Sequence, residues 1–330
     1  MHNYLLEVKD LTTRFVTRRG VAQAVNGVSF GMNPGEILGV VGESGCGKSV
    51  TAQSIMRLIP QPPGEIEKGE ILYGGKDLLK IPMKEMRDIR GDRISMIFQE
   101  PMTSLNPVKT IGRQIGEVYA LHRGASKAES MDRAVAMLEK VQVPEPGRRV
   151  KEFPHQLSGG MRQRVMIAMA LACDPEILIA DEPTTALDVT VQAQIMDLML
   201  RLQERQNTGI MMITHDLGII AEMATRVIVM YAGRIVESAP TRLLFQETAH
   251  PYTKGLMGSV PVIGSQAHGG RLTEISGMVP SLYDLPQGCS FAPRCAKKSP
   301  RCEMEMPPLF QLSEEHAVRC WDFEGQKEVV

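Results

Sequence analysis

The chain has 330 residues, of which 43% are hydrophobic and 23% are charged, a composition that is ordinary for a globular protein and argues against disorder. Lys and Arg number 37 and Asp and Glu 38, and the formal net charge of −1 provides no basic field, so we expect no nucleic-acid partner. No apolar run reaches the roughly 18 residues of a membrane span, and the N-terminus shows no apolar signal core. The length allows two domains.

Predicted strands and helices alternate along most of the chain. The strands are expected at residues 37–41, 94–98, 177–180, 210–213 and 227–230, and helices at 49–58, 191–203 and 217–223. Residues 99 to about 173 show a helical pattern, whereas the stretch after about residue 245 is rich in Pro, Gly and Cys. The alternation predicts an α/β fold in which helices cover a mostly parallel sheet.

A glycine-rich motif follows the first predicted parallel strand. Residues 42–49, GESGCGKS, match the phosphate-binding pattern G-x-x-x-x-G-K-[ST] in full. Its glycines let backbone N–H groups face a polyphosphate, Lys48 supplies a charge to the β- and γ-phosphates, and Ser49 supplies an oxygen to Mg²⁺. The predicted nucleotide-binding residues are Gly42, Glu43, Ser44, Gly45, Cys46, Gly47, Lys48 and Ser49. Cys46 contributes mainly its backbone, so we expect its thiol to be incidental.

Two adjacent carboxylates end the strand predicted at 177–180. Asp181 is suited to hold Mg²⁺, and Glu182 is suited to polarise an attacking water. The pair is weak evidence alone, but a phosphate-binding loop in the same chain makes it strong evidence for nucleotide hydrolysis.

The order of several further motifs resembles the ATP-binding-cassette family. The stretch LSGGMRQ at 157–163 resembles the family signature, Gln99 the Q-loop glutamine and Ala-Leu-Asp at 186–188 the D-loop. His215, which follows the next strand, resembles the switch histidine. Phe15 resembles the aromatic residue that stacks on adenine, although an ordinary core position is the alternative.

The resemblance implies a fold, a domain division and a set of roles. It implies a P-loop NTPase (RecA-like) nucleotide-binding domain over residues 1–245, with a helical subdomain at about 99–175 and an irregular Cys-rich extension at 246–330. Its cofactors would be ATP and Mg²⁺. Glu182 and His215 would be catalytic, and Ser49, Gln99 and Asp181 would hold Mg²⁺. In this family Ser158, Gly159, Gly160 and Asp188 would act in trans, on the ATP held by a facing chain.

Other stretches narrow the resemblance to one branch of the family. Residues 98–107, 164–170, 250–253 and 277–280 resemble the ATPase subunits of bacterial oligopeptide, dipeptide and nickel importers. Such a subunit would power peptide import from the cytoplasmic face of the membrane. It would work with a paralogous ATPase chain in a heterodimer rather than a homodimer, with two transmembrane permease subunits and, indirectly, with an extracytoplasmic solute-binding protein. The alternatives are an importer of nickel chelates or other small solutes, and a soluble ATPase without a transport role.

Four of the six cysteines lie in the last fifth of the chain. Cys289, Cys295, Cys302 and Cys320 have the spacing C-x₅-C-x₆-C-x₁₇-C, and four thiolates suit either Zn²⁺ or an iron–sulfur cluster. The spacing leaves both open, and the resemblance favours a [4Fe–4S] cluster over Zn²⁺. Four basic residues between the first and third cysteines would offset the negative charge of such a site, and a solvated basic loop is the alternative.

Overall fold

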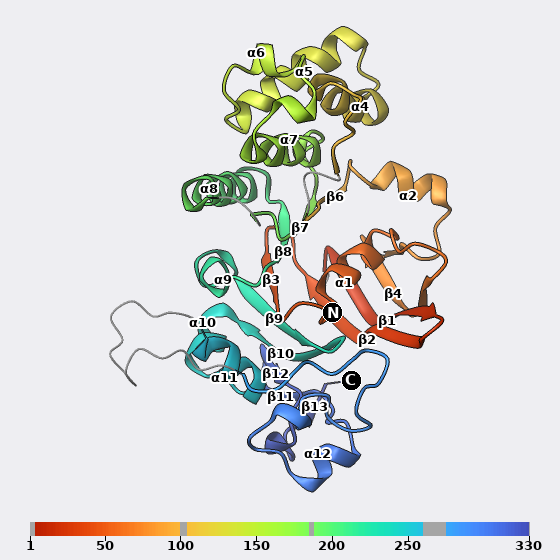
Figure 1. Cartoon of the computed structure of the whole chain (residues 1–330), viewed down its shortest axis with the longest axis vertical. Coiled ribbons are helices and arrows are strands. Elements are labelled where there is room, and N and C mark those ends of the chain that lie inside the picture. The colour runs from red at the N-terminus through yellow and green to blue at the C-terminus, as the bar shows by residue number, and fades with distance from the viewer. Residues whose placement is uncertain (1–3, 100–103, 185–187, 260–274, 330) are drawn as a thin grey trace. The chain divides into compact units, whose positions relative to one another are not determined.

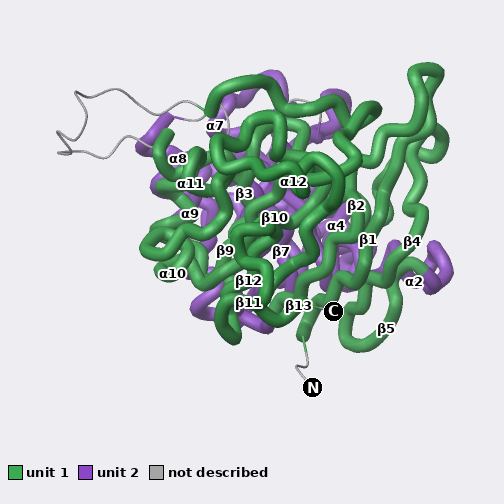
Figure 2. The backbone as a smooth tube through the Cα atoms, turned by 90° about the horizontal axis from the view of Figure 1, so that it is seen from below, with its two compact units in different colours: residues 1–32, 37–79, 214–330 green, residues 33–36, 80–213 purple. Residues whose placement is uncertain are grey.

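The computed structural model describes residues 4–99, 104–184, 188–259 and 275–329 (Figure 1). The chain forms two compact units (Figure 2). Unit 1 comprises Met1–Met32, Ile37–Leu79 and Thr214–Val330, and unit 2 comprises Asn33–Glu36 and Lys80–Ile213. Within the part of the chain that is described, no helix is long and apolar enough to cross a membrane.

Unit 1 contains an antiparallel sheet with the strand order β2-β1-β4-β5. These strands are β1 (Leu6–Thr17), β2 (Gly20–Met32), β4 (Gly64–Tyr73) and β5 (Lys76–Asp77). Leu6 lies opposite Met32 on one side and Tyr73 on the other, and Leu6 and Met32 are fully buried. The sheet is therefore anchored at the start of β1 by apolar pairs across neighbouring strands.

A second series of strands in unit 1 runs in the order β13-β11-β12-β10-β9-β3. Its members are β3 (Ile37–Val41), β9 (Arg226–Tyr231), β10 (Arg234–Pro240), β11 (Phe310–Ser313), β12 (His316–Val318) and β13 (Lys327–Glu328). Strands β3 and β9 are parallel, and every residue of β3 is buried, as expected for a parallel strand covered on both faces. The helices of this unit are α1 (Lys48–Ile55), α9 (Leu217–Met223), α10 (Thr241–Gln246), α11 (Pro251–Gly258) and α12 (Pro300–Met304), with 3₁₀ turns at Pro-containing η2 (Ala292–Arg294) and at η3 (Trp321–Phe323).

Unit 2 combines three parallel strands with most of the long helices. The strands β6 (Ile94–Ile97), β7 (Ile177–Asp181) and β8 (Gly209–Ile213) pair side by side, and all their residues are buried. The helices are α2 (Met83–Ile89), α4 (Ile111–Arg123), α5 (Lys127–Lys140), α6 (Pro146–Arg149), α7 (Gly159–Leu171) and α8 (Val189–Gln206), with η1 at Pro154–Gln156. Figure 1 shows α4, α5, α6 and α7 gathered into one helical group.

Local sequence explains the ends of the helices in this group. Helix α5 begins with a capping box, in which the Ser126 side chain accepts from the N–H of Glu129 and the Glu129 carboxylate accepts from the N–H of Ser126. Helix α4 ends at Arg123 and is followed by the C-cap residue Gly124, whose φ of 63° is the left-handed conformation that favours glycine. The buried residues of α5 include Ala134, Met137 and Leu138, whose three- and four-residue spacing places them on one face of the helix.

The predicted α/β fold is confirmed. Each of the five predicted strands is present to within a residue or two, and the helix predicted at 49–58 runs from Lys48 to Ile55. The extension after residue 245 has more regular structure than its sequence indicated. Strand β12 pairs with β10 through Glu237 opposite Val318, so the extension adds strands to the edge of the series that contains β3.

Candidate nucleotide-binding and catalytic site

The phosphate-binding loop connects β3 to α1 in unit 1, and its backbone requires glycine. Gly42, Gly45 and Gly47 have φ angles of 149°, 78° and 106°, which side chains rarely adopt. A Cβ on Gly42 would lie 2.2 Å from the carbonyl oxygen of Met230, and one on Gly47 would lie 2.3 Å from that of Ala24. The loop can therefore curl in this way only because these positions carry no side chain.

The side chain of Lys48 folds back toward the first residues of the phosphate-binding loop. Lys48 is only 6% exposed, and its Nζ donates to the carbonyl oxygens of Gly42 at 2.7 Å and Glu43 at 3.1 Å. Helix α1 begins at this residue, and no side chain caps its N-terminus, because the N-cap residue is Gly47. The loop thus brings a buried ammonium and a helix N-terminus together, which is the arrangement that binds phosphate oxygens.

Cys46 is a loop residue whose side chain is buried. Its side chain is 1% exposed, and burial raises the pKa of its thiol, so the neutral form is favoured. Its sulfur lies 3.6 Å from Lys48 Nζ. This placement fits the expectation that the thiol fills space while the backbone faces the ligand.

Glu43 is held by two residues that the sequence motifs did not connect with the phosphate-binding loop. Its backbone N–H donates to the hydroxyl of Tyr252 at 2.8 Å, and its carboxylate accepts from Arg294 at 2.6 and 3.0 Å. Both partners lie more than 200 residues further along the chain, in the extension. No local sequence signal connects them with the loop.

Phe15 lies on β1, opposite Ala22 and Gly64. The residue is half-buried, and a Cβ on Gly64 would lie 2.8 Å from an atom of its ring. The ring therefore packs over a glycine and keeps part of its surface exposed. That is compatible with stacking on an adenine base, and the role remains a prediction.

In unit 2, the end of β7 carries the two predicted carboxylates. Asp181 is the last residue of the strand and is 3% exposed. Glu182 has a φ of 47°, and its N–H donates to the carbonyl oxygen of Ile213 at 2.8 Å. Its Oε2 accepts a hydrogen bond of 2.9 Å from Nε2 of Gln99. This hydrogen bond fixes the orientation of the carboxylate that is predicted to act as the general base.

The structure therefore brings Gln99 to Glu182, a contact that the sequence did not indicate. The predicted roles of Gln99, Asp181 and Ser49 as Mg²⁺ ligands remain predictions. Residues 100–103 of the Q-loop stretch lie outside the described residues, as do Ala186 and Leu187 of the D-loop.

His215 lies in unit 1, in the turn between β8 and α9, and is exposed. The next residue, Asp216, caps α9 by accepting from the N–H of Gly218 at 2.8 Å, and its own N–H donates to the Thr214 hydroxyl at 3.0 Å. The turn that carries the predicted switch histidine is thus fixed by hydrogen bonds on both sides.

The residues predicted to act on a facing chain are available at the surface. Ser158 is the N-cap of α7 and accepts from the N–H of Met161 at 3.3 Å, and both Ser158 and Gly159 are exposed. Gly160 is half-buried in the first turn of α7. Asp188 is exposed and caps α8 by accepting from Val191 N–H at 2.9 Å.

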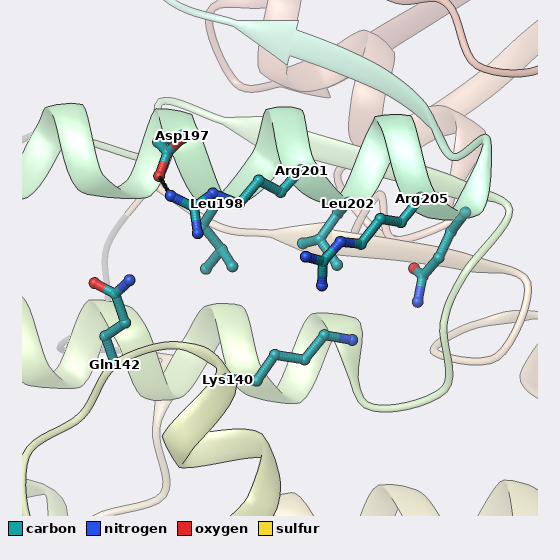
Figure 3. A pocket seen from close by; sticks show the side chains of 8 residues that line it. Lys140, Gln142, Asp197, Leu198, Arg201, Leu202 and Arg205 are labelled. Atoms are coloured by element: carbon teal, nitrogen blue, oxygen red, sulfur yellow. Dashed lines mark ion pairs between the residues drawn. The ribbon is translucent and has the colours of Figure 1, made fainter.

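Unit 2 also has a cleft of about 280 Å³ between the end of α5 and α8 (Figure 3). Its lining includes Lys140, Arg201 and Arg205, and Arg201 forms an ion pair of 2.6 Å with Asp197. None of the predicted site residues lines it, so the motifs assign it no part in ATP hydrolysis.

The four cysteines of the extension line one small cavity of about 20 Å³, together with Phe291 and Trp321. All four are free and half-buried. Burial raises the pKa of Cys320 to about 11 and also raises the pKa of Cys289 and Cys295, so these thiols are protonated at neutral pH.

The predicted metal site at these cysteines is not supported by their arrangement. Among the residues that the structure describes, no group of three or more His, Cys, Asp or Glu side chains is placed to hold a metal ion. The four basic residues that were predicted to offset the charge of such a site form ion pairs with carboxylates. The pairs are Arg294–Glu43, Lys297–Asp322, Lys298–Glu303 and Arg301–Glu305.

Comparison with known protein families gives two matches along the chain. Residues 25–185 match the ABC transporter family, and residues 236–302 match the C-terminal region of oligopeptide/dipeptide transporters. A solved dimeric structure of the ATP-binding cassette MJ0796, in a post-hydrolysis state bound to ADP and Pi, superposes with a TM-score of 0.65 at 30% identity. It covers 72% of this chain and 99% of that one.

Curated relatives match over nearly the whole length. The probable peptide ABC transporter ATP-binding protein y4tR of Sinorhizobium fredii is 53% identical, with 96% of this chain and 94% of the relative covered. The oligopeptide transport ATP-binding protein OppD of Bacillus subtilis is 53% identical over 96% of this chain and 88% of its own length. The dipeptide transport ATP-binding protein DppD of Bacillus subtilis is 50% identical, at 96% and 94% coverage. The chain belongs to the ATP-binding-cassette ATPases of the peptide transporters, enzymes that couple ATP hydrolysis to transport.

Proposed function

We propose that this ATPase powers the import of dipeptides or oligopeptides. The observation that carries the proposal is the combination of a complete phosphate loop with an extension that matches the C-terminal region of oligopeptide/dipeptide transporters over residues 236–302. The cassette match names ABC transporters in general, whereas the match to the extension names oligopeptide/dipeptide transporters. Relatives that are about half identical are named as peptide import or transport proteins.

The site residues divide the work of hydrolysis. Lys48 and the N-terminus of α1 bind the phosphates of ATP. Ser49, Gln99 and Asp181 would hold Mg²⁺, which would supply positive charge to the phosphates. Glu182, held by Gln99, removes a proton from the attacking water. His215 contacts the γ-phosphate as hydrolysis proceeds, and Phe15 stacks on the adenine.

The proposed assembly is a dimer of ATPase chains. The sequence has one phosphate loop and one signature, and the exposed Ser158, Gly159 and Asp188 supply contacts to ATP on a facing chain. We propose a paralogous ATPase as the partner, in preference to a second copy, on the cytoplasmic face of the membrane. Two permease subunits provide the membrane path, and a solute-binding protein outside the cytoplasm delivers the peptide.

Reconstitution tests this function. The ATPase is co-expressed with candidate permease and paralogous ATPase chains of the same organism, and the complex is placed in liposomes with the solute-binding protein. ATP-dependent uptake of a labelled dipeptide or oligopeptide supports the proposal. Uptake of a nickel chelate without peptide uptake supports the alternative importer, and ATP hydrolysis without any bound permease supports a soluble ATPase.

We also propose that Cys289, Cys295, Cys302 and Cys320 take up a [4Fe–4S] cluster, with Zn²⁺ as the alternative. The supporting observation is that all four sulfur-bearing side chains line one cavity, although the thiols must move closer together and lose protons to bind. The group would supply a cross-link within the extension. Iron and sulfide analysis of anaerobically purified protein tests this, and stoichiometric zinc without iron would contradict it.

A further inference from the structure

Arg294 lies in the extension, yet its side chain reaches the phosphate loop. It is the last residue of η2 and directly precedes Cys295. Its side chain is 4% exposed and forms an ion pair with the half-buried Glu43, the second residue of the loop. This ion pair therefore joins the cysteine-containing segment to the nucleotide site, although the two residues are 251 positions apart in sequence.

Every N–H of the Arg294 guanidinium has an acceptor. Nη1 and Nη2 each donate to one carboxylate oxygen of Glu43, at 2.6 and 3.0 Å. The remaining acceptors are the Tyr231 hydroxyl at 3.4 Å and the carbonyl oxygens of Ile275 at 3.2 Å and Ser276 at 3.1 Å. Five donors satisfied at once, two of them in a fork, define a position that a lysine cannot reproduce.

Aromatic rings form a dry platform beside this link. Tyr231 and Tyr252 have ring centroids 4.6 Å apart, and Phe291 lies 5.3 Å from Tyr231. The guanidinium carbon of Arg294 is 5.9 Å from the Tyr231 centroid and 6.0 Å from that of Phe291. Because the Arg294 side chain is buried against these rings, solvent screens the ion pair less than it would screen a pair on the surface.

Glu43 is held by the extension at two points and faces Lys48 at a third. Arg294 binds its carboxylate, and the Tyr252 hydroxyl accepts from its backbone N–H. Its carbonyl oxygen in turn accepts from Nζ of Lys48 at 3.1 Å. A shift of the segment that carries Arg294 would therefore move the part of the loop that positions the phosphate-binding lysine.

We propose that Arg294 is a positioning residue for nucleotide binding, which fixes the phosphate loop through Glu43 and couples the cysteine-containing segment to the affinity for ATP. Arg294 touches the loop and not the phosphates. Because coupling between two sites is reciprocal, nucleotide binding must also alter the behaviour of the segment around Cys295. The coupling does not depend on whether the four cysteines hold a metal group.

Binding of Mg²⁺–ATP to the full-length chain tests the first half of this proposal. R294Q is expected to weaken the affinity about tenfold, within the range typical of coupled sites. R294K is expected to be nearly as weak, because lysine cannot form the fork. E43Q is expected to weaken the affinity for ATP to a similar extent. The double variant E43Q/R294Q is expected to weaken it no further than either single change, since both changes remove the same interaction.

R301Q is a matched control. Arg301 also directly precedes a cysteine of the extension, is half-buried, and pairs with Glu305 at 3.0 Å and with Glu324. R301Q is expected to leave the affinity for ATP within about twofold of the wild type. Urea unfolding of every variant distinguishes a variant in which the extension has unfolded from one in which only the ion pair between Arg294 and Glu43 is lost. ATP affinity in R294Q that equals the wild type, or that falls only as far as in R301Q, would overturn the proposal.

Thiol labelling tests the reciprocal half. The rate at which an alkylating reagent modifies Cys295 is measured by mass spectrometry with and without Mg²⁺–ATP. In the wild type and in R301Q, nucleotide is expected to change this rate at least twofold. In R294Q, the change is expected to vanish even at ATP concentrations that saturate the variant. A nucleotide effect that persists in saturated R294Q, or that is missing from the wild type, would contradict the coupling.

Discussion

His250 provides a pH-dependent contribution to the stability of unit 1. It is 2% exposed and caps α11, where its Nδ1 accepts from the N–H of Tyr252 at 3.0 Å, while its own backbone N–H donates to Glu237. Burial lowers the pKa of its imidazole from 6.5 to about 4, against the opposing effect of the nearby Glu237 carboxylate.

The sign of the effect follows from proton binding in the two states. Below pH 6.5 the unfolded chain binds a proton at this imidazole, and the folded chain does not bind one until the pH nears 4. Stability is therefore present at neutral pH and is lost as the pH falls from about 6.5 to about 4. With these two pKa values, this side chain alone accounts for a loss of about 2 kcal/mol at pH 5.

Urea unfolding at pH 7.5 and pH 5 checks this value. H250N keeps a side-chain acceptor at the helix N-cap and cannot titrate, so its stability is expected to fall by about 2 kcal/mol less than that of the wild type between the two pH values. H155N removes an exposed histidine of unit 2 and serves as a control that should behave as the wild type does. Equal losses for H250N and the wild type would refute the reasoning.

Three further outcomes follow from the site. E182Q removes the general base and is expected to slow hydrolysis by about 10²- to 10⁴-fold while the Kd for ATP stays unchanged, and normal turnover would exclude Glu182 as the base. Q99A removes the amide that donates to Glu182, so kcat is expected to fall by less than in E182Q with the Kd for ATP retained; a lost affinity for ATP would instead assign Gln99 to binding. G47A places a Cβ 2.3 Å from the carbonyl oxygen of Ala24 and is expected to abolish ATP binding, whereas G45A meets no atom within 4 Å and should lose less; equal losses would show that backbone strain rather than space decides.

Local patterns predicted the core of the cassette well. The buried run at 37–41 and the glycines after it specify a strand, a tight loop and a helix start within a dozen residues, so all the necessary information is contiguous. The strand that ends at Asp181 was predictable for the same reason. The side-chain roles at these positions were inferred from the chemistry of the residue types, and they remain predictions.

The interactions that sequence analysis missed connect distant parts of the chain. The ion pair of Arg294 with Glu43 and the pairing of β12 with β10 depend on tertiary packing, and strands of three or four residues are too short to show alternation. The spacing of the four cysteines places them in one segment, but it cannot show that the basic residues between them pair with carboxylates.

Peptide uptake by the reconstituted complex tests the central claim most directly. The liposomes contain the wild-type ATPase, its partner ATPase and the permease subunits, and the solute-binding protein is supplied. A labelled dipeptide or oligopeptide is expected to accumulate only when ATP is present on the side that carries the ATPases. The same liposomes made with E182Q, which binds ATP but hydrolyses it slowly, should accumulate none above the ATP-free control. Uptake at the wild-type rate with E182Q, or no peptide uptake by a complex that hydrolyses ATP, would contradict the assignment.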